Sequence, residues 1–409
     1  MNSFSAAKFR NLLFFIPLVL MLPVQHSHAQ IQRLPKLEDG KILLTNMAIQ
    51  IECTSGVDNL YNFKFDQAES QFRWLQRNYP AHPLPYFLLG LVEWWKIVPN
   101  VNDKQYDEKF LSYMDSTVYF AEALFERDEQ NAEAPFFLAA AYAFEGRLHS
   151  ERQSWTRAAI AGKRALKYLD HSKKYADLSP ELLFGDGLYN YYSVWIPENY
   201  PVLKPLLIFF DKGDKTKGIE QLETVVKDAF YAKIEAMYFL MRIYSVEEKQ
   251  PFKALRIAEY LHRTFPDNSY FHRYYARMLY TLGRYPELEK ECIEILDKIE
   301  RNMPGYEAVS GRYASFYLAT YYMVRQFDNE NAKLYFQKAV TFAEEEKAWD
   351  SGYYLHSLAG LGKILAAEKQ MDMAMHYYEK VLDHADRKHS THKEARNFRK
   401  VYRQYQRAN

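Results

Sequence analysis

Apolar residues recur at helical spacing in two consecutive segments between residues 251 and 283. They are Ala254, Ala258 and Leu261, followed by Tyr275, Ala276 and Leu279. A spacing of three to four residues places each set on one face of a helix. Pro266 separates the two sets and Gly283 follows the second, as expected for a helix break and a helix end. The pattern predicts two antiparallel helices whose small residues allow close backbone approach.

The same pattern returns along most of the chain after residue 46. Further clear copies cover residues 65–90, 138–146 and 361–381. The repeated unit resembles the tetratricopeptide repeat, a helix–turn–helix of roughly 34 residues. This resemblance implies an all-α fold, namely a right-handed α-solenoid of stacked helix–turn–helix repeats.

Residues 387–409 are more polar and basic than the repeats before them. Their basic positions include Arg396, Arg399, Lys400, Arg403 and Arg407. Because the last repeat of an array must shield its apolar face from water, we expect a C-terminal capping helix here. The basic side chains also allow a second interpretation, a peripheral contact with the anionic surface of an envelope membrane.

Three glycine-containing segments near the middle of the chain carry a second resemblance. Residues 187–190 are Gly-Leu-Tyr-Asn, residues 213–214 are Gly-Asp, and Gly218 follows. Together with the proline-broken apolar segment between them, they resemble a signature of a eukaryotic tetratricopeptide family. That family is linked to the mitochondrial outer membrane and to inclusion-body clearance. The export signal described below disagrees with this location, so the resemblance implies shared architecture and no function.

The composition agrees with stacked helices. Hydrophobic residues make up 48% of the 409 positions and aromatic residues 16%, with 34 Tyr and only 15 Gly. Bulky, glycine-poor sequences suit interlocking helix faces better than tightly turning sheets. The formal net charge is +1, so no overall field attracts nucleic acid and we expect no nucleic-acid partner.

The N-terminus has the pattern of a secretory signal peptide over residues 1–29. Two basic residues precede an apolar run at residues 12–24, and small residues follow at the positions that a signal peptidase reads. We expect a cleaved signal, a leader at residues 30–45, and a periplasmic or envelope-associated protein. No cysteine lies near the cleavage point, so a lipoprotein anchor is not expected. An uncleaved membrane anchor is the alternative.

The repeat pattern divides the mature chain into parts with different regularity. They are N-terminal repeats at residues 46–175, an irregular repeat at 176–230, C-terminal repeats at 231–386 and the basic tail at 387–409. Within the irregular repeat, residues 195–217 contain three prolines and an apolar run. Its candidate contact residues are Trp195, Leu206, Phe209 and Phe210. This insertion either packs on the array itself or contacts a partner or a membrane surface.

The sequence contains only two cysteines, Cys53 and Cys292. An exported protein can form disulfides, but a repeat array is expected to hold these residues far apart. Cys292 also falls at a core-facing position of its predicted helix. We therefore expect two buried free thiols.

No motif for catalysis, a cofactor or a metal ion is recognisable. Gly213 and Gly218 have the spacing of a phosphate-binding loop, but Ile219 and Glu220 stand where it requires Lys and a hydroxyl residue. The three histidines within residues 384–392 do not share one helix face, and neighbouring basic side chains repel a cation. We expect no cofactor, no metal and no enzymatic activity. An active site assembled from distant repeats is the less favoured alternative.

The functional surface of such an array is expected on the concave face formed by the first helix of each unit. By register, this face receives Phe87, Leu91, Trp94, Arg273, Arg277, Tyr280, Tyr317 and Tyr321. Arg273 and Arg277 lie one turn apart and suit a carboxylate, while the tyrosines suit an extended peptide. The alternative for the aromatic residues is a role in the core between repeats.

These observations predict a protein-interaction scaffold that binds a peptide or protein partner in its groove. The alternative function is the binding of a glycan or another small ligand, because exposed aromatic rings stack on sugar rings. The sequence gives no indication of the oligomeric state.

Overall fold

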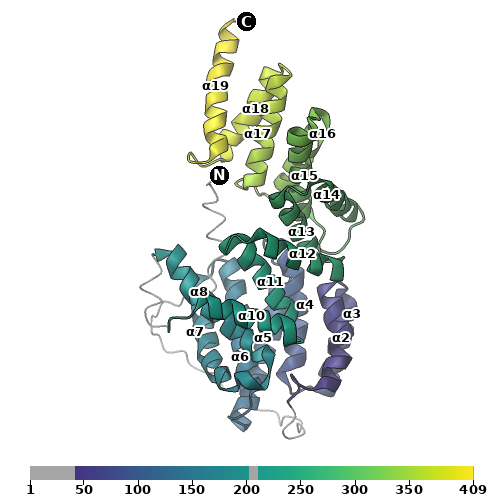
Figure 1. The fold of residues 1–409 in the computed structure, drawn as a ribbon, viewed down its shortest axis with the longest axis vertical. Coiled ribbons are helices and arrows are strands. Elements are labelled where there is room, and N and C mark those ends of the chain that lie inside the picture. Colours follow the sequence, from purple (N-terminus) through teal and green to yellow (C-terminus); the bar gives the residue numbers. More distant parts are fainter. Residues whose placement is uncertain (1–41, 202–210, 409) are drawn as a thin grey trace. The chain divides into compact units, whose positions relative to one another are not determined.

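A computed structural model describes residues 42–201 and 211–408, which form helices joined by short loops (Figure 1). These residues fall into two compact units, the N-terminal unit (residues 42–247) and the C-terminal unit (residues 248–408). No strand occurs in the described ranges. Helices that follow one another in sequence pack together in both units. The predicted all-α array of stacked helical hairpins is confirmed.

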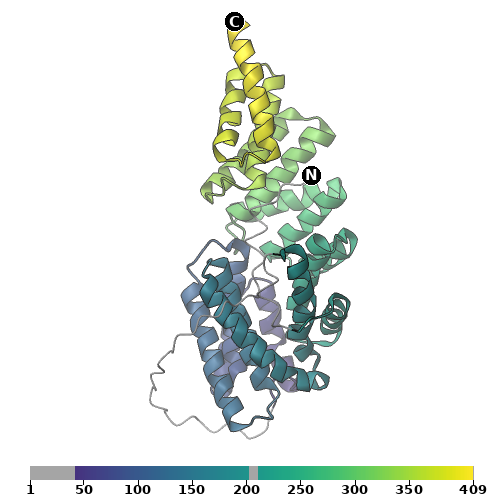
Figure 2. The ribbon, with the colours of Figure 1, turned by 90° about the vertical axis from the view of Figure 1, so that its left-hand side faces the viewer.

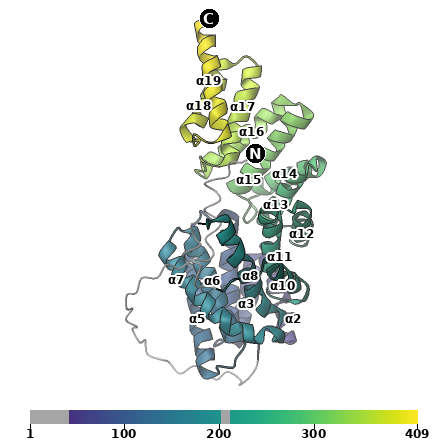
Figure 3. The same ribbon diagram turned by 60° about the vertical axis from the view of Figure 1, so that its left-hand side comes forward.

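The N-terminal unit consists of helices that pack side by side, as α5, α6 and α7 do in Figure 3. Its α-helices are α2 (Met47–Tyr61), α3 (Phe65–Asn78), α4 (Pro83–Ile97), α5 (Asp107–Arg127), α6 (Glu133–Glu151), α7 (Trp155–Ser172), α8 (Leu183–Asn199), α10 (Lys215–Asp228) and α11 (Lys233–Arg242). Short helical turns accompany them at η1 (Val98–Asn100), η2 (Lys173–Leu178), η3 (Pro180–Leu182) and η5 (Ile243–Glu247).

The C-terminal unit repeats the hairpin arrangement and ends in a single additional helix. Its α-helices are α12 (Pro251–Thr264), α13 (Ser269–Leu282), α14 (Tyr285–Glu300), α15 (Ala308–Tyr321), α16 (Asn329–Glu345), α17 (Gly352–Ala367), α18 (Met371–His384) and α19 (Ser390–Ala408), with a short turn η6 (Tyr322–Gln326) after α15. Figure 2 shows α17, α18 and α19 lying against one another at the yellow end of the chain.

Short polar residues and glycine set the ends of the helices. The Asn268 side chain accepts hydrogen bonds from the backbone N–H groups of Tyr270 and Phe271, which caps the start of α13. Gly283 adopts φ of 70° directly after α13, a left-handed conformation that glycine tolerates without strain. The second helix of the clearest repeat therefore starts after the break at Pro266 and ends at Gly283, as the sequence predicts.

Within a hairpin, a glycine of the first helix receives an aromatic ring of the second. A Cβ atom at Gly362 in α17 would lie 2.7 Å from a ring carbon of Tyr378 in α18. A Cβ atom at Gly311 in α15 would lie 2.6 Å from the ring of Phe342 in α16. These distances are too short for a carbon–carbon contact, so the bare glycine backbone is what allows the ring to enter.

The predicted capping helix is present as α19. Ala395 is fully buried, and the Tyr378 hydroxyl donates a hydrogen bond of 2.9 Å to Glu394. Lys363 pairs with the same Glu394 carboxylate at 3.0 Å. Beyond its contact with α17 and α18, the helix is mostly exposed and polar, as a terminal cap must be.

In the N-terminal unit, α11 packs against helices that are far from it in sequence. The carboxylate of Glu235 accepts hydrogen bonds from the Trp95 indole at 2.8 Å and from the Tyr61 hydroxyl at 3.3 Å. These contacts span 140 and 174 residues, respectively. Glu235 is almost fully buried, and Arg147 lies close enough to act on its charge. The N-terminal array thus closes on itself around a buried polar network.

The predicted groove position of three residues in α4 is wrong. Phe87, Leu91 and Trp94 are only 9%, 4% and 1% exposed, so they offer no open contact surface. The Trp94 ring packs against Phe144 at 5.6 Å and lies beneath the Arg147 guanidinium at 4.4 Å. These three residues therefore belong to the core between repeats, which was the alternative to a place in the groove. Their helix, α4, is apolar on every side, which is typical of a helix that is buried all round.

The mid-chain glycines mark a close crossing of α8 and α10. A Cβ atom at Gly218 would lie 2.6 Å from the Tyr191 backbone nitrogen and 2.7 Å from the Gly187 carbonyl oxygen. Backbone atoms cannot move aside as a side chain can, so this crossing requires glycine.

Of the four candidate contact residues in the insertion, Trp195 belongs to α8 and is 7% exposed. Its ring packs against Tyr192 and Tyr200 at about 6 Å. Leu206, Phe209 and Phe210 lie outside the described residues. A contact of this insertion with a partner or a membrane stays a prediction for those three.

Cys53 and Cys292 are both buried free thiols, as expected. Burial raises the pKa of Cys53 to about 11, so its thiol is protonated and unreactive at neutral pH. None of the described helices combines the length and the apolar character that a membrane crossing requires. The predicted signal peptide at residues 1–29 lies outside the described residues.

We expect Gly218→Ala to destabilise the N-terminal unit by about 1–3 kcal/mol, because the added methyl group would overlap two backbone atoms. Gly162→Ala is the matched control, since no atom lies within 4 Å of a Cβ at this α7 position. The control should be neutral or stabilising by up to about 1 kcal/mol. Urea unfolding followed by circular dichroism measures both, and equal effects would contradict the close crossing.

Candidate functional site

The inner helices α13, α15 and α17 of the C-terminal unit, which contact one another, carry a cluster of tyrosine and arginine side chains. We call it the Tyr–Arg face and define it by Tyr270, Arg273, Tyr274, Arg277, Tyr280, Arg312, Tyr313, Tyr317 and Tyr353. Spacings of three, four or seven residues place the α13 members on one side of that helix, and Tyr313 and Tyr317 are four residues apart in α15.

Two of the three arginines have polar partners within the face or beside it. The Arg273 guanidinium donates to the Ser310 hydroxyl at 3.1 Å and lies 5.4 Å from the centre of the Tyr313 ring. Arg312 pairs with the Glu346 carboxylate at 3.6 Å. Both arginines are therefore held in fixed positions by the fold.

Arg277 differs because no carboxylate pairs with it in the described parts of the chain. Its guanidinium lies 5.4 Å from the Tyr274 ring centre, and the tyrosines nearest to its charge include Tyr317 and Tyr353. Burial disfavours its charge, and the tyrosine hydroxyls around it are neutral at pH 7 and do not compensate it. The side chain is a permanently charged group in a mostly aromatic environment.

The tyrosines of the face are packed against one another. Tyr280 stacks on Tyr317 with ring centres 4.5 Å apart, and Tyr313 lies 4.5 Å from Tyr353. The hydroxyls of Tyr317 and Tyr353 are 3.1 Å apart and share a hydrogen bond. Tyr317 is buried, while Tyr280, Tyr313 and Tyr353 remain partly exposed. The rings thus form a rigid platform with accessible edges.

The structure brings together four residues that the sequence predicted for the groove, namely Arg273, Arg277, Tyr280 and Tyr317. Of these, Arg277 and Tyr280 are partly exposed, whereas Arg273 and Tyr317 are only 9% and 1% exposed and support the face from beneath. Tyr321 lies outside the face, because its ring stacks on Tyr285 of α14 at 5.6 Å. Whether the four residues bind a partner stays a prediction.

The sequence analysis missed five members of the face: Tyr270, Tyr274, Arg312, Tyr313 and Tyr353. A signal was available, because Tyr270 and Tyr274, and also Tyr313 and Tyr317, are four residues apart and share a helix side. Tyr353 has no such neighbour in its own helix, so only the packing of α17 against α15 identifies it.

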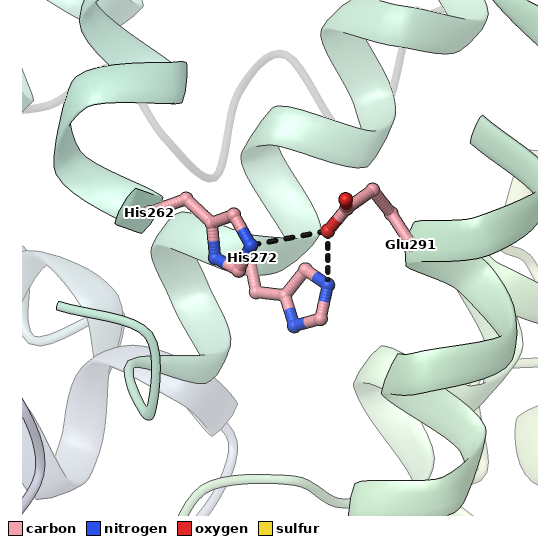
Figure 4. A group of neighbouring side chains, drawn as sticks. All are labelled: His262, His272 and Glu291. Carbon is pink, nitrogen blue, oxygen red and sulfur yellow. Dashed lines mark ion pairs between the residues drawn. The ribbon is translucent and has the colours of Figure 1, made fainter. Parts of the chain in front are cut away.

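A second cluster lies between α12, α13 and α14, and we call it the His–His–Glu cluster (Figure 4). His262, His272 and Glu291 each direct one nitrogen or oxygen atom toward a common point. The Nε2 atoms of both histidines are 3.0 Å from the same Glu291 oxygen, Oε2. The two imidazole rings stack with their centres 4.1 Å apart.

The far side of His272 is held by a hydrogen-bond network. Its Nδ1 atom is 3.0 Å from the Tyr306 hydroxyl, which donates to the Pro266 carbonyl at 3.2 Å. Lys298 donates to the same carbonyl at 2.7 Å and pairs with Glu294 at 3.0 Å. Burial lowers the pKa of His272 to about 4, so the imidazole is neutral at pH 7.

Sequence reasoning did not find this cluster. His262, His272 and Glu291 are separated by 10 and 19 residues, a spacing that matches no familiar ligand motif. The histidines that the sequence did single out behave differently. His389 uses its Nδ1 atom for a 2.7 Å hydrogen bond with the Thr391 hydroxyl, and His384 packs against Trp349.

The comparison with protein families finds one repeat within the chain. The tetratricopeptide repeat model matches residues 355–383, which form most of the α17–α18 hairpin. The chain has no significant match among curated proteins.

Solved structures resemble the chain at low identity. The human IFIT1 dimer with PPP-AAAA is 15% identical with a TM-score of 0.41, covering 82% of this chain and 72% of that chain. The P58(IPK) TPR domain is 12% identical with a TM-score of 0.25, covering 88% and 99%. Yeast Tom70 is 11% identical with a TM-score of 0.23, covering 87% and 96%. At these identities and TM-scores, none of the three assigns a function to this chain.

The stacked hairpins define the chain as a helical repeat array. The hairpin of α17 and α18 matches a tetratricopeptide repeat, and the other described hairpins are stacked in the same helical manner.

The unequal pairing of Arg277 and Arg312 predicts opposite effects on stability. Arg277→Met should raise the free energy of unfolding by about 0.5–2 kcal/mol, because it removes a charge without a carboxylate partner and keeps the packing. Arg312→Met should lower it by about 1–3 kcal/mol, because Glu346 would be left buried and unpaired. Urea unfolding tests both, and a loss of stability in Arg277→Met would contradict the assignment.

Proposed function

We propose that this chain is a non-catalytic scaffold that binds an acidic segment of a partner protein on its Tyr–Arg face. A carboxylate of the partner pairs with Arg277, and apolar or aromatic side chains beside it pack on the tyrosine rings. The observation that carries this proposal is the Arg277 guanidinium, which sits among tyrosines without a carboxylate partner in the described residues.

The energetics of charge burial support a carboxylate as the ligand group. A guanidinium with few protein acceptors gains most from an anion with matching oxygen geometry, and carboxylates bind such groups with two parallel hydrogen bonds. Arg312 is less suited to bind a partner's carboxylate, because its guanidinium is already paired with Glu346. Arg277 is thus the anchor for one acidic side chain or a chain terminus.

The tyrosine platform supports a peptide rather than a lone ion. Tyr280, Tyr313 and Tyr353 are partly exposed, and their stacking fixes the rings before a partner arrives. Aromatic surfaces that are already ordered lose little side-chain entropy on binding. A short extended segment with one acidic residue next to an apolar one fits both features of the face.

We also propose that the scaffold acts in the cell envelope after export. The basis is the signal-peptide pattern of residues 1–29, with its basic start, apolar run and small residues near position 29. The partner would then be an envelope protein that the same compartment contains.

Arg277→Glu should reduce partner binding at least about tenfold, since a hydrogen bond between charged groups contributes about 1.5–3 kcal/mol. Crosslinking and pull-down from the native envelope identifies the partner, and fluorescence anisotropy with its acidic segment measures the affinity. Arg277→Lys keeps the positive charge but lacks the planar guanidinium that forms two parallel hydrogen bonds. Its affinity for the partner should lie between those of the wild type and Arg277→Glu.

The matched control is Arg263→Glu in α12. Arg263 is 73% exposed and pairs only with Glu259 one turn away, so charge reversal there should leave binding unchanged. If Arg277→Glu and Arg263→Glu bind the partner equally well, the Tyr–Arg face is not the binding site. Capture of a glycan in place of a protein would instead favour the alternative function.

A further inference from the structure

Three helices of the C-terminal unit each contribute one side chain to the His–His–Glu cluster. We propose that His262, His272 and Glu291 bind one divalent first-row transition-metal ion, and that Zn²⁺ fits this ligand set best. The donors are two imidazole nitrogens and one carboxylate oxygen, all within 4.8 Å of one another. In Figure 4 the three donor atoms converge on the same small space.

Two of these atoms are buried without a hydrogen-bond partner. Neither His272 Nε2 nor Glu291 Oε2 makes a hydrogen bond among the described residues, although they are 3.0 Å apart. His272 is fully buried, so solvent does not compensate for the missing partner. Buried polar groups are nearly always satisfied, and a pair left unsatisfied at one point indicates an absent ligand.

The hydrogen bonds on the other side of His272 fit the tautomer that a metal ligand requires. The Tyr306 hydroxyl donates to the Pro266 carbonyl at 3.2 Å, so its oxygen is free to accept a proton from His272 Nδ1, 3.0 Å away. A neutral imidazole with its proton on Nδ1 presents the Nε2 lone pair toward the Glu291 carboxylate, and a cation between the two atoms would bind both.

The ligand spacing suits a small borderline cation. Tetrahedral Zn²⁺ with bonds of about 2.0–2.1 Å separates its ligand atoms by about 3.3 Å. The two Nε2–Oε2 distances of 3.0 Å require an adjustment of only a few tenths of an ångström. Two imidazoles argue against Mg²⁺ and Ca²⁺, which prefer oxygen ligands.

The surroundings also suit a metal site. The second ring nitrogen of His272 is hydrogen-bonded to Tyr306, and such a bond orients metal-binding histidines and fixes their tautomer. The nearest cation, Lys298, lies on the far side of Tyr306 and is paired with Glu294. The side chains of His262 and Glu291 are 10% and 12% exposed, which leaves access for an ion and a water molecule as fourth ligand.

A bound ion would tie together three consecutive helices. His262 is near the end of α12, His272 is in α13 and Glu291 is in α14. The ion would hold these helices together where helix packing leaves two buried polar atoms without hydrogen-bond partners. The proposal does not depend on the function of the Tyr–Arg face.

The test is isothermal titration of the full mature chain with Zn²⁺, after chelator treatment and removal of any affinity tag. We expect one ion per chain and a melting temperature that rises by about 3 °C or more at 100-fold excess over Kd. Glu291→Gln keeps the shape of the side chain but lacks the charge, and should weaken Zn²⁺ binding at least about 100-fold. Tyr306→Phe should weaken it by about 10–100-fold through the orientation of His272.

The matched control is His389→Ala, which removes one of the three histidines within residues 384–392 and none of the proposed ligands. The His389→Ala variant should bind Zn²⁺ with unchanged affinity. Co²⁺ bound to the wild-type chain should give the absorption bands of a tetrahedral site, and Glu291→Gln should abolish these bands. Wild-type protein that binds no stoichiometric Zn²⁺ would overturn the proposal. So would Glu291→Gln with unchanged affinity, or His389→Ala with lost affinity.

Discussion

The contact between a glycine in one helix and an aromatic ring in the next is the interaction on which several of the hairpins depend. It occurs between Gly362 and Tyr378 near the C-terminus and between Gly56 and Phe72 near the N-terminus, where the distance to a Cβ atom would also be 2.7 Å. Because the ring lies directly on the backbone, the two helices of a hairpin are held at one distance. Each hairpin then presents a second apolar face, which only a neighbouring hairpin can cover.

The two units differ in the residues that cover their inner faces. In the N-terminal unit, Phe87 and Trp94, the aromatic residues predicted for a groove, are core because they pack against α6, while α11 contacts α2 and α4 through Glu235. In the C-terminal unit, the inner helices α13, α15 and α17 carry tyrosines and arginines in place of aliphatic residues. Polar aromatic side chains tolerate partial exposure, because the ring packs while the hydroxyl stays hydrated.

Local properties of this structure were predictable from the sequence, and distant contacts were not. Helical periodicity and the Pro266 and Gly283 boundaries predicted the α12–α13 hairpin, and register predicted that Arg273, Arg277 and Tyr280 share a face. The closure at Glu235 joins residues 140 and 174 positions apart, and no periodic signal encodes such a contact. An apolar helix such as α4 indicates burial on all sides, but it does not identify the helix that covers it.

The Tyr–Arg face and the His–His–Glu cluster share α13, which connects their physical roles. His272 and Arg273 are adjacent, so their side chains leave the helix about 100° apart and point into different surroundings. Arg277 and Tyr280 follow within the next two turns of the same rigid helix. Any ligand that fixes His272 therefore also limits the rotation and sliding of the helix that presents Arg277. Since a preorganised site loses less entropy on binding, a metal ion in the cluster would favour the proposed binding at the face.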